Sequence, residues 1–479
     1  MITHNTPYIG GEWISSDGLE QMAVEDPATG EILGEYGRGT RDHVRRALES
    51  AHAAFPLWSG RTARDRARLL TRAAERLREN ADELARSVTR ENGKPLAESL
   101  GEVKGAAAHF EWYAEEGCRA YGRIVPPEAK GKRHLIIRVP VGVVGCIVPW
   151  NFPLVLWARK VAPALAAGCT VVSRGASQTT LCTMQALDCI ADLFPPGVLN
   201  LVTGEARQVS EELLSNPLCR KVSFTGSTAA GRELLRRGAD SIAHLSLELG
   251  GHGPAIVFPD ADPETAVSGI MGAKFRNGGQ SCIAINRVYL HRDVAADLTK
   301  QLVDATASLK VGNGLADGVE VGPLIDKKGV GTFLAHVNGA VMQGAKIECG
   351  GEELRGGDFD AGNFVAPTVL SGVSDDMLCM CSETFGPLLP IAIFDTLDEV
   401  VGRANDSEYG LAAYVFTSSL ETAFTMGERL EAGTIGINDP VPSTTIAPFG
   451  GVKQSGIGRE CGAEGLDAFL ETKHLSIKL

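Results

Sequence analysis

The chain has 479 residues, 44% hydrophobic and 22% charged, as is ordinary for a soluble globular protein of about three domains. Its net charge of −13 argues against a general nucleic-acid binder, which needs a basic face. No apolar run approaches about 20 residues, and the N-terminus lacks a basic segment followed by an apolar core, so we expect neither a membrane span nor a signal peptide. The eleven cysteines form no paired Cys-x-x-Cys sets, which argues against a metal site and favours reduced thiols in the cytoplasm.

The first 140 residues are predicted to form small strands, then helices, then one more strand. Residues 8–32 alternate short apolar stretches with Gly-Gly, Asp-Gly and Asp-Pro turn signals, which indicates hairpins. Over residues 40–117, apolar residues recur at three- and four-residue spacing, and Gly93-Lys94-Pro95 divides this region into separate helices. A β-rich run over 134–139 is typical of an edge strand.

Strands and helices alternate from Val141 onward. The apolar run 143–148 is typical of a parallel strand buried on both faces. After Glu248 the alternation restarts, so we predict two α/β domains, the first of them doubly wound. The predicted helices cover 154–167 and 181–193, and the predicted strands cover 170–172, 198–202, 221–224, 254–258, 287–290, 364–370 and 389–394.

One cysteine follows an unusual stretch. A helix-like segment over 266–274 leads into Phe275-Arg276-Asn277-Gly278-Gly279-Gln280-Ser281-Cys282. Glycines let the backbone approach a ligand closely, so this thiol is a candidate nucleophile. A cysteine taken at random is more often a buried apolar residue. Four other stretches favour the nucleophile: Pro149-Trp150-Asn151-Phe152-Pro153, Leu247-Glu248-Leu249-Gly250-Gly251, Glu383-Thr384-Phe385-Gly386-Pro387 and Pro448-Phe449-Gly450-Gly451.

Together and in this order, the five stretches resemble the aldehyde dehydrogenase superfamily, from about Tyr8 to the C-terminus. The resemblance implies an α/β fold with a dinucleotide-binding domain (1–121 and 141–250) and a catalytic domain (251–445). It also implies oligomerisation and bridging segments at 122–140 and 446–479, the first of which pairs with a neighbouring subunit. We therefore expect a homo-oligomer, a dimer or a tetramer.

The nucleotide site has no Gly-x-Gly-x-x-Gly fingerprint. Instead, a strand ends at Phe224-Thr225-Gly226-Ser227, and a helix is expected from Arg232, whose free backbone N–H groups suit a pyrophosphate. By resemblance, Gly226 and Ser227 contact the phosphates, Glu383 holds the nicotinamide ribose and Phe385 lies against the cofactor. Cofactor contacts are also implied at Ile147, Pro149, Trp150, Phe224, Leu249 and Gly250.

The adenosine end departs from the family pattern. The family typically has Lys-Pro-(Ser/Ala)-Glu where this chain has Arg174-Gly175-Ala176-Ser177. Arginine keeps a cation for ribose or phosphate, whereas serine removes a carboxylate that would repel a 2′-phosphate. We therefore expect NADP or NAD as cofactor, with NADP favoured.

The predicted chemistry requires a nucleophile, oxyanion donors and a base. Cys282 is the candidate thiolate, and the Asn151 amide with the Cys282 backbone N–H are the candidate oxyanion donors. Glu248 is the candidate base for hydrolysis of a thioester, and partial burial would raise its proton affinity. By resemblance, Lys160 supports the oxyanion site. A CoA-acylating enzyme, which does not need the base, and a non-catalytic binding protein are the competing classes.

Within the superfamily, the chain is most similar to succinate-semialdehyde dehydrogenases. Arg159 and Arg276 match the two arginines that bind the substrate's distal carboxylate there, and Ser443 or Thr444 could donate to the same anion. The alternative is that each arginine pairs with a local acid. The expected substrate is a small anionic aldehyde such as succinate semialdehyde, with 2-oxoglutarate semialdehyde, glutarate semialdehyde or a sulfonated aldehyde such as sulfolactaldehyde as alternatives.

Overall fold

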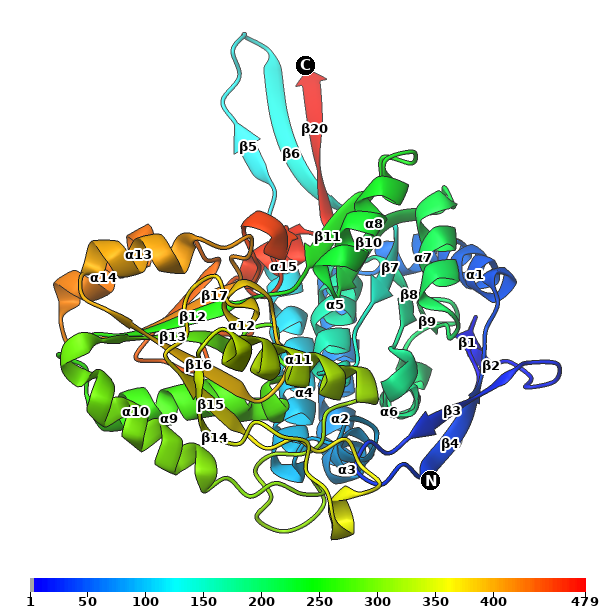
Figure 1. Ribbon diagram of the computed structural model, residues 1–479. Helices are drawn as coiled ribbons and strands as arrows, with labels where there is room; N and C mark the ends of the chain where they lie inside the picture. Colours follow the sequence, from blue (N-terminus) through cyan, green and yellow to red (C-terminus); the bar gives the residue numbers. More distant parts are fainter. Residues whose placement is uncertain (1–3) are drawn as a thin grey trace.

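The computed structural model describes residues 4–479. Two α/β bodies lie side by side, and a narrow three-stranded arm projects away from them (Figure 1). Within the described residues, no helix combines the length and the apolar character needed to cross a membrane.

The first body is built on an eight-stranded sheet in the order β19-β11-β10-β7-β8-β9-β1-β2. Neighbouring strands from β11 to β9 are parallel, and β19, β1 and β2 pair antiparallel at the edges. The strands are β1 (Tyr8–Ile9), β2 (Glu12–Trp13), β7 (Val143–Ile147), β8 (Thr170–Arg174), β9 (Leu199–Leu201), β10 (Cys219–Thr225), β11 (His244–Glu248) and β19 (Gly456–Ile457).

Helices cover both faces of this sheet, as the apolar run of β7 predicts. Val143 and Ile147 pack with α1, α7 and α8 on one face, while Val144 and Cys146 pack with α2 to α6 on the other. Side chains alternate across a strand, so a central parallel strand needs apolar residues at every position. The helices are α1 (Arg41–Ser59), α2 (Ala63–Glu79), α3 (Ala81–Asn92), α4 (Leu96–Glu116), α5 (Pro153–Ala167), α6 (Thr180–Asp188), α7 (Ala206–Ser215) and α8 (Thr228–Gly238).

The second body has a seven-stranded sheet in the order β14-β15-β16-β13-β12-β17-β18, parallel except for β14. Helices α9 and α10 pack on one face, and α11, α13 and α14 pack on the other. Its strands are β12 (Gly253–Val257), β13 (Ile285–His291), β14 (Lys346–Cys349), β15 (Thr368–Ser371), β16 (Leu388–Phe394), β17 (Ala412–Phe416) and β18 (Thr434–Ile437). Its helices are α9 (Pro263–Phe275), α10 (Arg292–Ala307), α11 (Lys327–Met342), α12 (Leu378–Cys381), α13 (Leu397–Asn405) and α14 (Leu420–Arg429).

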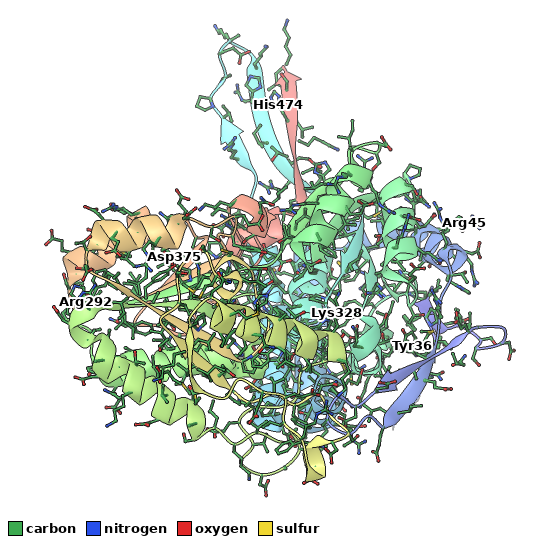
Figure 2. The ribbon with its side chains drawn as sticks, viewed as in Figure 1. Tyr36, Arg45, Arg292, Lys328, Asp375 and His474 are labelled. Atoms are coloured by element: carbon green, nitrogen blue, oxygen red, sulfur yellow. The ribbon has the colours of Figure 1, made fainter. Side chains whose placement is uncertain are left out.

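The arm consists of β5 (Arg123–Val125), β6 (Lys132–Pro140) and β20 (Leu470–Lys478), with β6 in the middle. It carries His474 at the top of the molecule in Figure 2. The C-terminal segment therefore contributes to two places: β20 completes the arm, and β19 adds an edge strand to the first sheet beside β11. Helix α15 (Gly462–Asp467) lies between them, and a separate hairpin of β3 (Gln21–Glu25) and β4 (Ile32–Gly37) borders the first body. The predicted domain boundaries remain a prediction.

Two predicted elements begin or end at other residues than expected, in addition to the helix expected from Arg232, which begins at Thr228. The helix expected over 181–193 ends at Asp188, because Ile190 leaves helical backbone angles (φ −128°) and is fully buried; Ala191–Leu193 then form a separate 3₁₀ turn. The strand expected over 364–370 begins only at Thr368. Pro367 has no N–H group to donate to a neighbouring strand, which explains the late start.

Candidate active site

The predicted cofactor residues lie where the strand order of the first sheet reverses. From β7 the chain proceeds through β8 to β9 in one direction, and β10 and β11 lie on the other side of β7. At such a point the loops after the strands diverge and leave a crevice at the carboxyl ends of the strands. Two adjoining cavities of about 530 and 410 Å³ occupy this place and share Pro149, Trp150, Gln178 and Thr225 in their walls.

All of the residues predicted to contact the cofactor line these cavities. The larger one contains the residues that the resemblance assigns to the adenosine end, and the smaller one reaches Cys282. Tyr36 and Lys328, which line the larger and the smaller cavity respectively, mark them in Figure 2. The larger cavity includes Ile147, Pro149, Trp150, Arg174, Ser177 and Phe224, and the smaller one includes Gly226, Ser227, Leu249, Gly250, Glu383 and Phe385.

Helix α8 begins earlier than the sequence suggests, at Thr228 rather than Arg232. The Ser227 side chain caps the helix by accepting from the Ala230 backbone N–H at 3.3 Å. The cap places the helix N-terminus, with its free N–H groups, directly beside Gly226 at the cavity wall, where a phosphate is favourably bound.

At the adenosine end, Arg174 is 7% exposed and donates to Ser177 Oγ at 3.0 Å and to the Gly204 carbonyl. Sequence reasoning missed Tyr36 and Arg38 in this wall, because they come from the β3–β4 hairpin, far away in the chain. Arg38 pairs there with Glu20 and Glu205. Gln178 was also missed, although it directly follows Ser177 and lines both cavities.

The loop that carries Cys282 is held by close backbone contacts. Asn277 has φ +51° and Gly279 has φ +76°, both left-handed. A Cβ at Gly279 would lie 2.2 Å from the Gly386 carbonyl oxygen, and a Cβ at Gly251 would lie 2.2 Å from the Cys282 carbonyl oxygen. Only glycine permits these approaches. The loop therefore packs directly on the two stretches that border the smaller cofactor cavity.

Cys282 and Asn151 lie where two cavities meet. Both line the smaller cofactor cavity, and both also line a third cavity of about 290 Å³. Burial, together with Glu383 and Glu248, raises the pKa of the Cys282 thiol to about 12. These surroundings favour the protonated thiol, which must lose its proton before it acts as a nucleophile.

The Asn151 amide nitrogen donates to the Gln280 carbonyl at 3.1 Å, and its Oδ1 is buried without a partner. One amide hydrogen therefore remains for another acceptor. The Asn151 backbone carbonyl is fixed by Lys94 Nζ and by the Asn277 side chain. Lys94 also pairs with Glu102 of α4, so Asn151 is linked to α4 through Lys94. Asn277 links it to the Cys282 loop.

Glu248 ends β11 and is enclosed, 3% exposed, with Oε2 unpartnered. Burial and the neighbouring Glu460 raise its pKa well above the usual value, as partial burial predicts, whereas Lys160 and Arg159 oppose the shift. The resemblance associates Lys160 with the oxyanion site; in the structure its ammonium group pairs with Glu460, beside Glu248. Neither Glu248 nor Lys160 lines the three cavities.

All four predicted substrate residues line the third cavity: Arg159, Arg276, Ser443 and Thr444. Within residues 4–479 neither arginine has an acid within ion-pair distance, although Glu98 acts on Arg276, and Glu248 and Glu460 act on Arg159, at longer range. Arg159 donates to Ser443 Oγ at 3.2 Å and lies over the Phe449 ring, and Arg276 lies over the Phe152 ring. Two cations that form no direct ion pair and lie beside the thiol suit an anionic ligand.

Glu383 is a half-buried carboxyl in the wall of the smaller cavity. It accepts from the Gly251 backbone N–H at 3.2 Å, and burial raises its pKa to about 8. Phe385 has φ +52°, and its ring meets Trp150 edge to face at 5.5 Å. Strained backbone of this kind is common where a protein holds a ligand.

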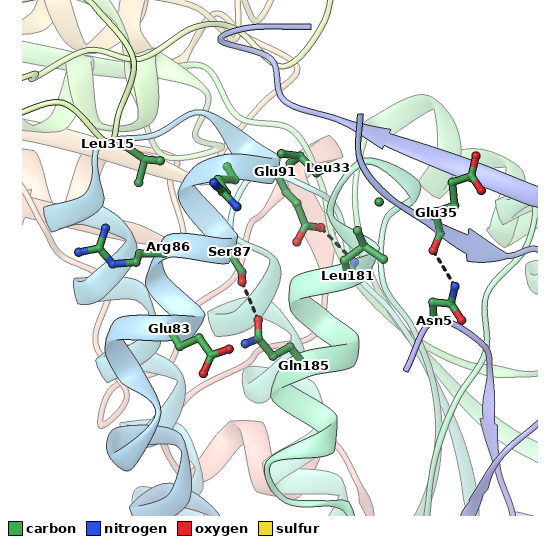
Figure 3. Close-up of a pocket in the computed structure, with 12 residues that line it drawn as sticks. Asn5, Leu33, Glu35, Glu83, Arg86, Ser87, Glu91, Leu181, Gln185 and Leu315 are labelled. Atoms are coloured by element: carbon green, nitrogen blue, oxygen red, sulfur yellow. Dashed lines mark hydrogen bonds between the residues drawn. The ribbon is translucent and has the colours of Figure 1, made fainter. Parts of the chain in front are cut away.

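A more spacious hollow, about 780 Å³, lies elsewhere, between α3, α6 and β4 (Figure 3). Its wall is held by a Ser87–Gln185 hydrogen bond and by Glu91, which accepts from the Leu181 N–H. It contains none of the predicted site residues. Among the residues described, no cluster of three or more His, Cys, Asp and Glu side chains is arranged to hold a metal ion.

The chain is similar to known proteins over nearly its full length. The family model described as "Aldehyde dehydrogenase family" matches residues 13–475. The succinate-semialdehyde dehydrogenase (NADP(+)) GabD of Escherichia coli is 44% identical, over 98% of this chain and 97% of the relative. A glutarate-semialdehyde dehydrogenase of Pseudomonas putida is also 44% identical, over the same shares. The crystal structure of succinate-semialdehyde dehydrogenase from Burkholderia pseudomallei superposes with a TM-score of 0.97, at 42% identity, covering 99% of this chain and 98% of that one.

Proposed function

The chain belongs to the aldehyde dehydrogenase family, and from this premise we propose that it oxidises a small anionic semialdehyde to the carboxylate, with NADP or NAD as acceptor. The observation that carries the proposal is the meeting of two cavities at Cys282 and Asn151, one lined by the cofactor residues and the other by two unpaired arginines.

In the proposed reaction, the Cys282 thiol gives its proton to water in the cavity, and the resulting thiolate attacks the aldehyde carbon and forms a thiohemiacetal. The free amide hydrogen of Asn151 and the Cys282 backbone N–H donate to the oxyanion. A bound nicotinamide cofactor supplies the hydride acceptor. The resulting thioester is hydrolysed by water that Glu248 deprotonates, and Cys282 leaves as thiolate. Glu248 is close enough to Cys282 to raise the pKa of its thiol, which supports this role.

The two arginines, which form no ion pairs, support the proposal that the substrate carries an anionic tail. Succinate semialdehyde is the first choice, in agreement with the names of relatives. The alternatives are glutarate semialdehyde, 2-oxoglutarate semialdehyde and sulfolactaldehyde, each of which also has an aldehyde group and an anionic tail. A CoA-acylating reaction is disfavoured, because such an enzyme does not need the base Glu248, and the intact Cys282, Glu248 and Asn151 disfavour a non-catalytic role.

Replacement of either arginine tests whether the arginines bind the anionic tail of the substrate. Arg159→Leu and Arg276→Leu should each lower kcat/KM for succinate semialdehyde about ten- to a hundredfold, since a charge-assisted hydrogen bond is worth roughly 1.5–3 kcal/mol. Butanal, a neutral aldehyde of the same length, should lose little. Equal losses for both aldehydes would show that the arginines hold structure rather than substrate.

NADP is the favoured cofactor, because Ser177 leaves room for a 2′-phosphate beside Arg174. Ser177→Glu should raise the KM for NADP far more than that for NAD, since a carboxylate and a 2′-phosphate repel each other. Steady-state kinetics with both cofactors measures this. If both cofactors respond alike, position 177 does not face the adenosine ribose.

Location and assembly complete the proposal. The scattered cysteines favour the reducing cytoplasm. The projecting arm presents exposed Ile124 and half-exposed Leu475, which favours a homo-oligomer, a dimer or a tetramer, in which a neighbouring copy covers the arm.

A further inference from the structure

One wall of the third cavity is formed by residues that have no part in the oxyanion site or in the pair of arginines. We propose that His109 is a specificity-determining residue that donates a hydrogen bond to an oxo or hydroxyl oxygen next to the substrate's anionic tail. The inference rests on the proposed function, because it assumes that the anionic tail occupies this cavity beside Arg159.

The wall in question is one stripe of helix α4. Gly101, Gly105 and His109 are spaced four residues apart, so they share a face, and all three line the cavity together with Arg159 and Arg276. Gly101 is exposed, Gly105 half-buried and His109 buried. The stripe therefore runs from the surface to the cavity floor.

Packing does not explain the two glycines. A Cβ at Gly101 would meet nothing within 4 Å, and a Cβ at Gly105 would come no closer than 3.4 Å, an ordinary contact with Val155. A glycine inside a helix is destabilising relative to alanine. Alanine would fit at both positions and stabilise the helix, so what the glycines provide is open space along the cavity wall.

His109 at the end of this space lacks hydrogen-bond partners. Its side chain is 2% exposed, Nδ1 is enclosed without a partner, and no hydrogen bond of Nε2 is found among residues 4–479. The ring stacks against Tyr113, at 6.4 Å between centroids and 14° between planes. Buried polar groups normally have partners, so an unsatisfied imidazole in a cavity wall indicates a ligand that completes it.

The chemistry of the imidazole restricts the ligand group. Burial and the charge of Arg159 lower the pKa of His109 well below its usual value, so the ring is neutral. A neutral imidazole has one N–H donor and no charge to balance a second anion. An uncharged oxygen, oxo or hydroxyl, is the matching group, and the nearness of Arg159 places it beside the tail anion.

The test uses two substrates that differ only in that oxygen. Glutarate semialdehyde and 2-oxoglutarate semialdehyde have the same length and terminal charges, and the second carries an oxo group on the carbon next to the carboxylate. The native enzyme should favour the oxo compound in kcat/KM by about two- to tenfold, the range of one neutral hydrogen bond. His109→Phe should bring the ratio close to one, and His109→Gln, which keeps an N–H donor, should restore part of it.

Two further variants separate recognition from structure. Lys104→Ala, on the exposed face of the same helix, should leave the ratio unchanged. Gly105→Val fills the open space and should lower kcat/KM for the oxo compound more than for succinate semialdehyde, which is shorter and unsubstituted. The inference is overturned if the native ratio is near one, or if His109→Phe keeps the native ratio. The proposed function fails separately, if neither anionic aldehyde is oxidised better than pentanal.

Discussion

Two buried lysine–glutamate pairs lie close to the proposed site and differ in how completely they are hydrogen-bonded. Lys94 pairs with Glu102 at 2.7 Å, with both side chains fully buried, at the amino end of α5. Lys160 pairs with Glu460, 300 positions away in the chain, beside Glu248.

The first pair is saturated. Lys94 also donates to the Asn151 carbonyl and lies over the Phe152 ring at 3.8 Å. Glu102 accepts from the backbone N–H groups of Leu154 and Val155, at the positive end of the α5 dipole. Every polar contact fixes the turn that carries Asn151, so this pair positions the oxyanion donor.

The second pair is incomplete. Glu460 Oε2 and Glu248 Oε2 are both buried without partners. Unsatisfied buried carboxylate oxygens cost stability, which a scaffold has no reason to accept. The difference indicates that the saturated pair holds geometry, while Glu248, beside the incomplete pair, is arranged to take up and release a proton. Three experiments test this contrast, from the largest expected effect to the smallest.

The largest effect is expected for Glu248→Gln. Steady turnover should fall about 10²- to 10⁴-fold, the usual contribution of general base catalysis, while part of the first burst of reduced cofactor remains, because only thioester hydrolysis needs the base. Stopped-flow absorbance of the reduced nicotinamide separates the two phases. Equal loss of burst and turnover would mean that Glu248 acts earlier, for example on the thiol.

Lys94→Met should mainly affect stability. Breaking a buried pair leaves Glu102 as an uncompensated charge, and the free energy of unfolding should fall by about 3–5 kcal/mol. Denaturant titration measures the loss. The double variant Lys94→Met with Glu102→Leu removes both charges and should recover much of it. A loss under 1 kcal/mol in the single variant would contradict a positioning role for the pair.

The smallest effect is expected on the pH profile. Glu248 acts as the ionised base, so turnover limited by hydrolysis should rise as pH rises through its pKa. Burial and Glu460 raise that pKa and Lys160 lowers it. Lys160→Met should therefore move the midpoint to higher pH and Glu460→Gln to lower pH, with about a tenfold change in rate per unit on the acidic side. Profiles of kcat against pH that coincide with the native one would contradict the coupling.

Local sequence patterns predicted many of the helices and strands and the position of the candidate nucleophile. The apolar run of β7, the helical period of residues 40–117 and the glycines before Cys282 each act over a few residues, so they could be interpreted without a structure. The expected α/β fold and family are confirmed. The predicted cofactor and substrate residues line the cavities because strand ends, which turn residues mark in the sequence, come together at one edge of a sheet.

Only the tertiary structure decided which charges remain unpaired. Arg159 and Arg276 form no ion pair and face the same cavity from α5 and the Cys282 loop, and Glu460 meets Lys160 across 300 positions. His109 was not predicted at all, because a histidine within a helix has the same local pattern whether it faces a core or a ligand. Burial and partners depend on long-range packing, which sequence periodicity does not determine.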